Sequence, residues 1–190
     1  KEILSIDLKD NVTFEILNIK DIREGDEYGG FKINIMATMD NLKIHLVVEI
    51  TTGDKITPRE IEYNYNSIFE NKKISILAYT TETIIAEKYQ TIITRGILNT
   101  RMKDFYDIYV LISKNKNMIN IQNLRMAIKN TFKNRKTEIS VLEMQETVKE
   151  IEKDKEMKKL WKNYQKNAIY AREIKFEDLF NPLYFITSIL

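Results

Sequence analysis

The hydrophobic pattern of this chain changes its period near residue 80, and that change constrains the fold more than any other feature. Before it, apolar side chains alternate at every second residue, and after it they recur about every 3.6 residues. Short strands followed by a run of helices are typical of an α+β protein. We therefore expect a mostly antiparallel or mixed sheet region over residues 1–80 and a helical region over 81–190.

The expected strands follow from alternation and from turn residues. Residues 12–19 alternate loosely after the turn-like sequence KDN, a glycine pair precedes a strand over 31–39, and Asp-Asn leads into a strand over 42–50. The second and third strands predict an antiparallel hairpin whose third strand enters the core. A fourth strand is expected over 73–79.

Capping residues and helical spacing predict five helices in the second half of the chain. Thr80 or Thr81 can cap a helix that continues to about residue 95, where Gly96 ends it. A second helix is expected from about Arg101 to Ile112. The remaining three helices are expected over 121–134, 140–170 and 176–189.

Composition excludes several classes of protein. Thirty basic and 28 acidic residues leave a net charge of +2, so no global field requires nucleic acid or a membrane as partner. The absence of cysteine excludes disulfides and thiolate chemistry and suits a reducing cytoplasm, and the single His45 excludes a multi-histidine metal site. No apolar run approaches the roughly 20 residues of a membrane span. We expect a cytoplasmic protein without a membrane partner.

Lys88 lies inside the apolar stripe of the helix expected to end near residue 95. At about 100° per residue from Ile84, the stripe centres near about 80°, with Lys88 at about 40° and Arg95 at about 20°. A buried ammonium group needs an anion or a path to water. Either the lysine stem covers the stripe while its head reaches solvent, or Lys88 faces a cavity that receives a phosphate or carboxylate.

The next expected helix repeats this pattern with the opposite charge. Asp104 lies within its apolar arc, and Asp107 lies at the edge of that arc. Acidic residues in a first helical turn often serve only to stabilise the helix dipole. Alternatively, an inward carboxylate beside Lys88 would satisfy both charges, or both groups would point at a ligand.

Glu49 is a third charged residue among apolar neighbours. It follows Leu46, Val47 and Val48 in a strand that looks central, where a carboxylate is costly unless it binds a metal, a proton or a cation. Because the strand ends two or three residues later, Glu49 could also surface at the edge of the sheet. Together with Lys88 and Asp104 it forms a candidate site.

Three segments carry a resemblance to a known family. EITTGDKITP, AYTTETIIAEKYQTIITR and RMKDFYDIYVL resemble the nucleotidyltransferases of the AbiEii/AbiGii toxin family, which belong to type IV toxin-antitoxin and phage-abortive systems. The resemblance covers most of residues 10–112 and continues more weakly through the helical tail. It implies a growth-inhibiting toxin that transfers NMP from an NTP to an RNA, such as tRNA, or to a protein, with an antitoxin encoded nearby.

The same resemblance, through DNA polymerase β-type transferases, implies roles for individual residues. Glu49 would be the third acid of a Mg²⁺ site, Lys88 would contact the nucleotide phosphates, and Asp104 would be the acid of the last motif. Arg95 and Asp107 would complete the nucleotide-binding group. Such carboxylates would hold metal ions, and one of them could activate the attacking hydroxyl.

The chain departs from the family pattern at its beginning. No Gly-Ser motif and no Asp-x-Asp pair precede Glu49. We therefore expect either a fragment of a longer enzyme, which alone would not transfer nucleotides, or a chain that has lost catalysis. The alternative functions are a non-catalytic nucleotide- or partner-binding module of the same fold, and a structural domain whose inward charges pair internally.

Overall fold

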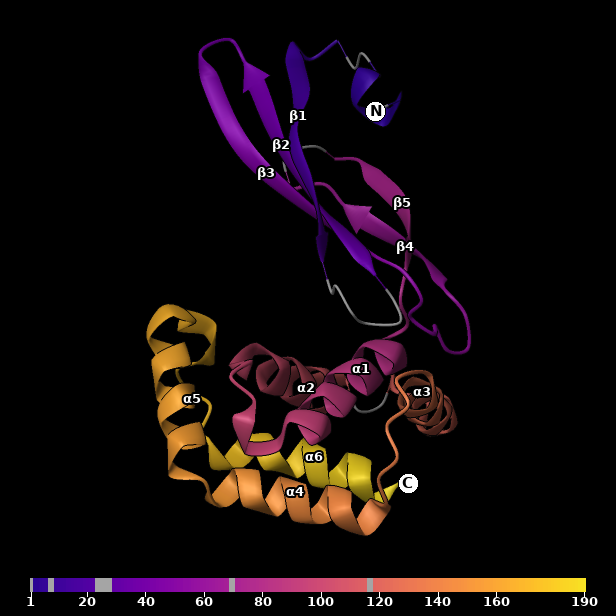
Figure 1. Ribbon diagram of the computed structural model, residues 1–190, viewed down its shortest axis with the longest axis vertical. Coiled ribbons are helices and arrows are strands. Elements are labelled where there is room, and N and C mark those ends of the chain that lie inside the picture. Colours follow the sequence, from indigo (N-terminus) through magenta and orange to yellow (C-terminus); the bar gives the residue numbers. More distant parts are fainter. Residues whose placement is uncertain (1, 7–8, 23–28, 69–70, 116–117) are drawn as a thin grey trace. The chain divides into compact units, whose positions relative to one another are not determined.

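The structure is a computed structural model that describes all residues except 1, 7–8, 23–28, 69–70 and 116–117 (Figure 1). Contacts divide the chain into two compact units, Lys1–Asp54 and Lys55–Leu190, which we call the N-terminal and C-terminal units. In the described residues, antiparallel strands precede a run of helices, which confirms the expected α+β class. The change from strand to helix falls between Ala78 and Thr81.

The N-terminal unit contains a three-stranded antiparallel sheet in the order β1 (Val12–Ile22), β2 (Gly30–Met39) and β3 (Leu42–Thr51). The hairpin predicted for the second and third strands is confirmed, with Met39 paired to Leu42 across a two-residue turn. Asp40 in this turn has a φ of 50°. Tight two-residue hairpin turns require positive φ, which aspartate tolerates better than most residues.

The two faces of this sheet differ in polarity. Residues that pair across antiparallel strands lie on the same face, so the register places one wholly apolar row of β2 opposite another of β3. The rows are Phe31, Ile33, Ile35, Ala37 and Met39, opposite Ile50, Val48, Leu46, Ile44 and Leu42.

A β-bulge in β1 places two isoleucines of that strand on the apolar face of the sheet. The register shifts between Ile16 and Asn18, so that both Ile16 and Ile19 pair with isoleucines of the apolar row of β2. On the opposite face Asn34 donates a hydrogen bond to Asn18 (2.7 Å), and Lys32 pairs with Glu49. Glu49 therefore lies on the polar face of the sheet.

The expectation that the third strand enters a core is wrong. All ten residues of β3 are exposed, and β3 is an edge strand of the described sheet. Among the described residues of the N-terminal unit, the short 3₁₀ turn Glu2–Ser5 is the only other regular element. That turn is too small to form a second layer, so the strand stays exposed despite its apolar side chains.

The C-terminal unit begins with a hairpin of β4 (Ile61–Asn66) and β5 (Lys73–Ala78). β5 agrees with the strand expected over 73–79, whereas β4 was not predicted. Its alternation of Ile61, Tyr63 and Tyr65 with polar residues was nevertheless visible in the sequence. The helices that follow are α1 (Thr81–Arg95), α2 (Met102–Asn115), α3 (Ile121–Asn134), α4 (Val141–Lys153), α5 (Lys155–Asn167) and α6 (Phe180–Ser188).

Helix boundaries follow the capping residues, with one correction. Thr80 caps α1 by accepting a hydrogen bond from the Thr83 N–H, and Gly96 ends it with a φ of 52°. The single helix expected over 140–170 is wrong, because Asp154 ends α4 and caps α5 by accepting from the Met157 N–H (2.8 Å). The last helix begins at Phe180, after a 3₁₀ turn that starts at Glu177.

Helix α1 is central to the core of this unit. It packs against α2 and α3, while α6 packs against α2 and α4 (Figure 1). The largest side chains with almost no exposure include Trp161, Tyr89, Phe105 and Phe180. This packing fixes the relation between α1 and α2, the helices that carry Lys88 and Asp104. None of the helices among the described residues is long and apolar enough to cross a membrane.

Candidate functional site

The packing of α1 against α2 brings Lys88, Asp104 and Asp107 together. The Lys88 Nζ donates to Asp104 Oδ1 at 2.8 Å and lies 2.7 Å from Asp107 Oδ2. The Asp104 side chain is 5% exposed, and that of Lys88 is 22% exposed. The inward direction that helical periodicity predicted for Lys88 and Asp104 is therefore confirmed, and the two residues meet each other.

Two more cations surround the carboxylates. Arg101 Nε donates to Asp104 Oδ2 at 2.9 Å, and Lys103 Nζ lies 2.8 Å from Asp107 Oδ2. Counted with Lys88, three cations and two carboxylates leave one positive charge in this group. We call these five residues the Lys88 cluster.

Neither Arg101 nor Lys103 was predicted as a site residue from helical periodicity. The signal was their spacing, because Arg101, just before α2, precedes Asp104 by three residues, and Lys103 of α2 precedes Asp107 by four. The start of α2 is also fixed by Asn99, whose buried Oδ1 accepts a hydrogen bond from the Arg101 N–H at 2.9 Å.

The carboxylates keep Lys88 charged. Burial alone would lower the pKa of Lys88, but hydrogen bonds to Asp104 and Asp107, together with the charges of the two carboxylates, outweigh it and raise that pKa above 10.5. Lys88 is therefore an ammonium at neutral pH. Its partial exposure allows that charge to act on an anion outside the cluster.

The other two predicted site residues, Arg95 and Glu49, differ from the buried part of this cluster in their exposure. Arg95 is exposed in the last turn of α1. Glu49 belongs to the N-terminal unit, where its side chain is 56% exposed and lies 3.2 Å from Lys32 Nζ. Of the two alternatives for Glu49, the structure confirms the one in which this residue surfaces at the edge of the sheet, within the N-terminal unit.

The Lys88 cluster does not fit a metal site in this arrangement. Among the described residues, no group of three or more histidine, aspartate or glutamate side chains is placed to hold an ion. Asp104 Oδ1 contacts Lys88 and Asp104 Oδ2 contacts Arg101, so both carboxylate oxygens already face cations. The contacts of Asp104 therefore do not support a metal-dependent step at the Lys88 cluster.

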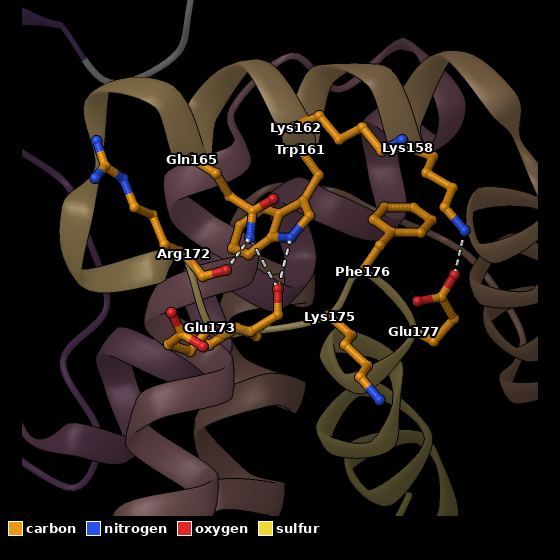
Figure 2. Close-up of a pocket in the computed structure, with 10 residues that line it drawn as sticks. Lys158, Trp161, Lys162, Gln165, Arg172, Glu173, Lys175, Phe176 and Glu177 are labelled. Carbon is orange, nitrogen blue, oxygen red and sulfur yellow. Dashed lines mark hydrogen bonds and ion pairs between the residues drawn. The ribbon is translucent and has the colours of Figure 1, made fainter.

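A separate cavity lies under α5 (Figure 2). It measures about 250 Å³, and Trp161 and Phe176 supply apolar surface to it. Trp161 Nε1 donates to the Ile174 carbonyl at 3.1 Å, and Gln165 Nε2 donates to the same carbonyl at 2.9 Å. The charged side chains around it are Lys158, Lys162, Arg172, Glu173, Lys175 and Glu177, of which Lys158 and Glu177 form an ion pair.

Comparison with known proteins identifies a family that the chain matches. A family model described as "Nucleotidyl transferase AbiEii toxin, Type IV TA system" matches residues 1–182 of this chain. No curated protein and no solved structure matches the chain. The match spans both units and includes the whole Lys88 cluster.

Proposed function

The chain belongs to the AbiEii family of nucleotidyltransferase toxins of type IV toxin-antitoxin systems, and from this premise we propose that Lys88 binds the phosphates of the nucleotide substrate. The reaction is the transfer of NMP from an NTP to an RNA, such as tRNA, or to a protein. An acceptor hydroxyl oxygen forms a bond to the α-phosphorus, the bond to the bridging oxygen of the β-phosphate breaks, and pyrophosphate leaves. The proton of the hydroxyl passes to solvent.

The observation that carries this proposal is the charged, partly exposed ammonium of Lys88 on an anchored helix pair. Two carboxylates hold its Nζ at 2.7–2.8 Å, so that its position is set before a ligand arrives. The excess positive charge of the Lys88 cluster favours a phosphate, and a fixed ammonium beside a phosphoryl group stabilises charge that develops during transfer. In this proposal Asp104 and Asp107 are positioning residues.

Arg95 and Glu49 complete the proposed assignment. Arg95, exposed on α1, is proposed as a second phosphate contact. Glu49 is proposed as a ligand of Mg²⁺, the ion that nucleotidyltransferases generally use to neutralise a triphosphate. On the same family premise we propose a cytoplasmic location, a role in phage defence and a cognate antitoxin encoded nearby.

A labelling experiment tests this function. The product of the complete open reading frame is incubated with Mg²⁺, cellular RNA and protein, and each of the four radioactive NTPs in turn. We expect label in one acceptor class, with loss of most labelling in Lys88→Ala. The matched control is Lys129→Ala, which removes an exposed lysine of α3 and should label normally. No label with any nucleotide, together with undiminished toxicity of Lys88→Ala, would rule the function out.

A second candidate is a nucleotide-binding module without turnover. The observation that favours it is the engagement of both Asp104 oxygens by cations, which compete with a metal ion for that carboxylate. Equilibrium binding separates the two candidates. A module would bind an NTP and lose that binding in Lys88→Ala, but would release no pyrophosphate.

A further inference from the structure

Three tyrosines gather where α5 packs against α2. Tyr106 comes from α2, Tyr164 from α5, and Tyr170 from the 3₁₀ turn that follows α5. The ring centroids of Tyr106 and Tyr170 are 4.8 Å apart, and the hydroxyls of Tyr164 and Tyr170 are 3.0 Å apart. We call these three residues the tyrosine platform.

The platform differs from the packed aromatic residues of the core in its exposure. Tyr89 has no exposed surface and its hydroxyl pairs with Thr187 at 2.7 Å, as expected of a structural residue. Tyr170, in contrast, is 60% exposed although two neighbouring tyrosines hold its ring in place. An exposed ring of fixed orientation is suited to stacking against a planar ligand.

The platform adjoins the Lys88 cluster through α2. Tyr106 directly precedes Asp107, whose carboxylate lies 2.7 Å from the Lys88 Nζ. Burial chiefly, then the hydrogen bond and charge of Tyr170, raise the pKa of Tyr164, and the charge of Asp107 adds to that increase. The Asp107 carboxylate therefore acts electrostatically on the platform as well as on Lys88. Because the Tyr164 phenol stays neutral, it adds no negative charge that would repel a phosphate.

We propose that Tyr170, supported by Tyr106 and Tyr164, stacks against a nucleobase of a nucleotide whose phosphate contacts Lys88. This inference rests on the proposed function, because it takes Lys88 as the phosphate contact. Aromatic side chains stack on any nucleobase, and this interaction is sequence-tolerant. The base belongs either to the incoming NTP or to the end of an RNA acceptor.

The test uses matched substitutions of Tyr170 in the product of the complete open reading frame. Tyr170→Leu keeps apolar volume but removes the aromatic face, whereas Tyr170→Phe keeps the face and removes the hydroxyl. Ile169→Ala alters the adjacent side chain, which is 71% exposed, and is the control. Trp161 fluorescence checks that each variant is folded, because this single tryptophan is buried in the C-terminal unit.

Equilibrium binding of each NTP and of a short single-stranded RNA is measured first. Tyr170→Leu should weaken binding of one of these ligands by about 5- to 150-fold, the range for loss of one base stack. Tyr170→Phe and Ile169→Ala should bind as the unaltered protein does. Weaker binding of NTP assigns the base to the substrate, and weaker binding of RNA assigns it to the acceptor.

Binding and transfer are read separately so that this inference and the proposed function can fail independently. Loss of binding in Tyr170→Leu, in a protein that transfers no nucleotide, would support the platform and contradict the enzyme. If the unaltered protein transfers label, and Tyr170→Leu shows unchanged affinity and unchanged KM for both NTP and RNA, the platform alone would be overturned. Absence of any NTP or RNA binding by the unaltered protein would overturn the platform as well.

Discussion

Replacement of Lys88 by methionine separates the structural contribution of this residue from its proposed function. Methionine has a similar length and no charge, and it suits the apolar stripe of α1. The substitution removes contacts at 2.8 Å to Asp104 and 2.7 Å to Asp107. It also removes the cost of taking the ammonium out of water, since that side chain is 22% exposed.

The magnitude follows from these opposing effects. Hydrogen bonds that involve charged groups contribute about 1.5–3 kcal/mol each, while the desolvation penalty of a buried ion amounts to several kcal/mol. Removal of one partner is most damaging when it leaves a buried charge alone. Here Asp104 keeps Arg101 at 2.9 Å and Asp107 keeps Lys103 at 2.8 Å. We expect Lys88→Met to lower the free energy of unfolding by about 1–2 kcal/mol.

The assay is urea denaturation followed by the fluorescence of Trp161, with Lys129→Met as the control for loss of one exposed charge. The folded pKa of Lys88 is raised, so its stabilisation is fully present below the unfolded value of 10.5 and is lost as pH rises through the folded value. The difference between Lys88→Met and the unaltered protein should therefore shrink at strongly alkaline pH. A loss above about 4 kcal/mol, or greater stability of Lys88→Met at neutral pH, would refute the reasoning.

Two further predictions concern single buried contacts. Gly30→Ala should destabilise the N-terminal sheet by about 1–3 kcal/mol, because the added Cβ would lie 2.6 Å from the Ile50 carbonyl oxygen. The measurement is amide hydrogen exchange, which should become faster in β2 and β3. Unchanged exchange would contradict this prediction. Burial raises the pKa of Tyr89 to about 12, and the hydrogen bond between Tyr89 and Thr187 opposes this increase without cancelling it. Because the folded pKa is the higher one, this phenol contributes stability below about pH 10 that is lost between about pH 10 and 12. Tyr89→Phe has no phenol to titrate, so its stability should fall less across that window in urea titrations, by on the order of 2–3 kcal/mol. Parallel curves for the two proteins would disprove the assignment.

Helical periodicity predicted the inward direction of Lys88 in α1 and of Asp104 in α2, but it placed Arg95 on the same side as Lys88, and Arg95 is exposed. The angle of Lys88 within its apolar stripe depends only on the spacing along one helix, and the sequence contains that spacing. The identity of its partners depends on how α1 crosses α2. That crossing is set by side chains far apart in the sequence, so Lys88 could not be assigned to both Asp104 and Asp107 in advance.

The direction of Glu49 was harder to predict because one residue obscures the pattern of β3. Leu42, Ile44, Leu46, Val48 and Ile50 alternate with Lys43, His45 and Glu49, and only Val47 interrupts this alternation. The run from Leu46 to Val48 resembles a buried central strand, which led to the wrong expectation of a core position. The register with β2 resolves the ambiguity by placing Glu49 opposite Lys32 on the polar face.

The contacts of Glu49 and Asp104 have different consequences for their proposed roles. The Lys32–Glu49 pair has a distance of 3.2 Å, and both side chains are more than 40% exposed. Exposed pairs contribute about 0–1 kcal/mol, so Glu49 can exchange Lys32 for a metal ion at little cost. Asp104, only 5% exposed and bound to two cations, would lose far more by such an exchange. The contacts of Asp104 suit a group that holds Lys88 in place, and the weaker contact of Glu49 is compatible with the Mg²⁺ role proposed for it.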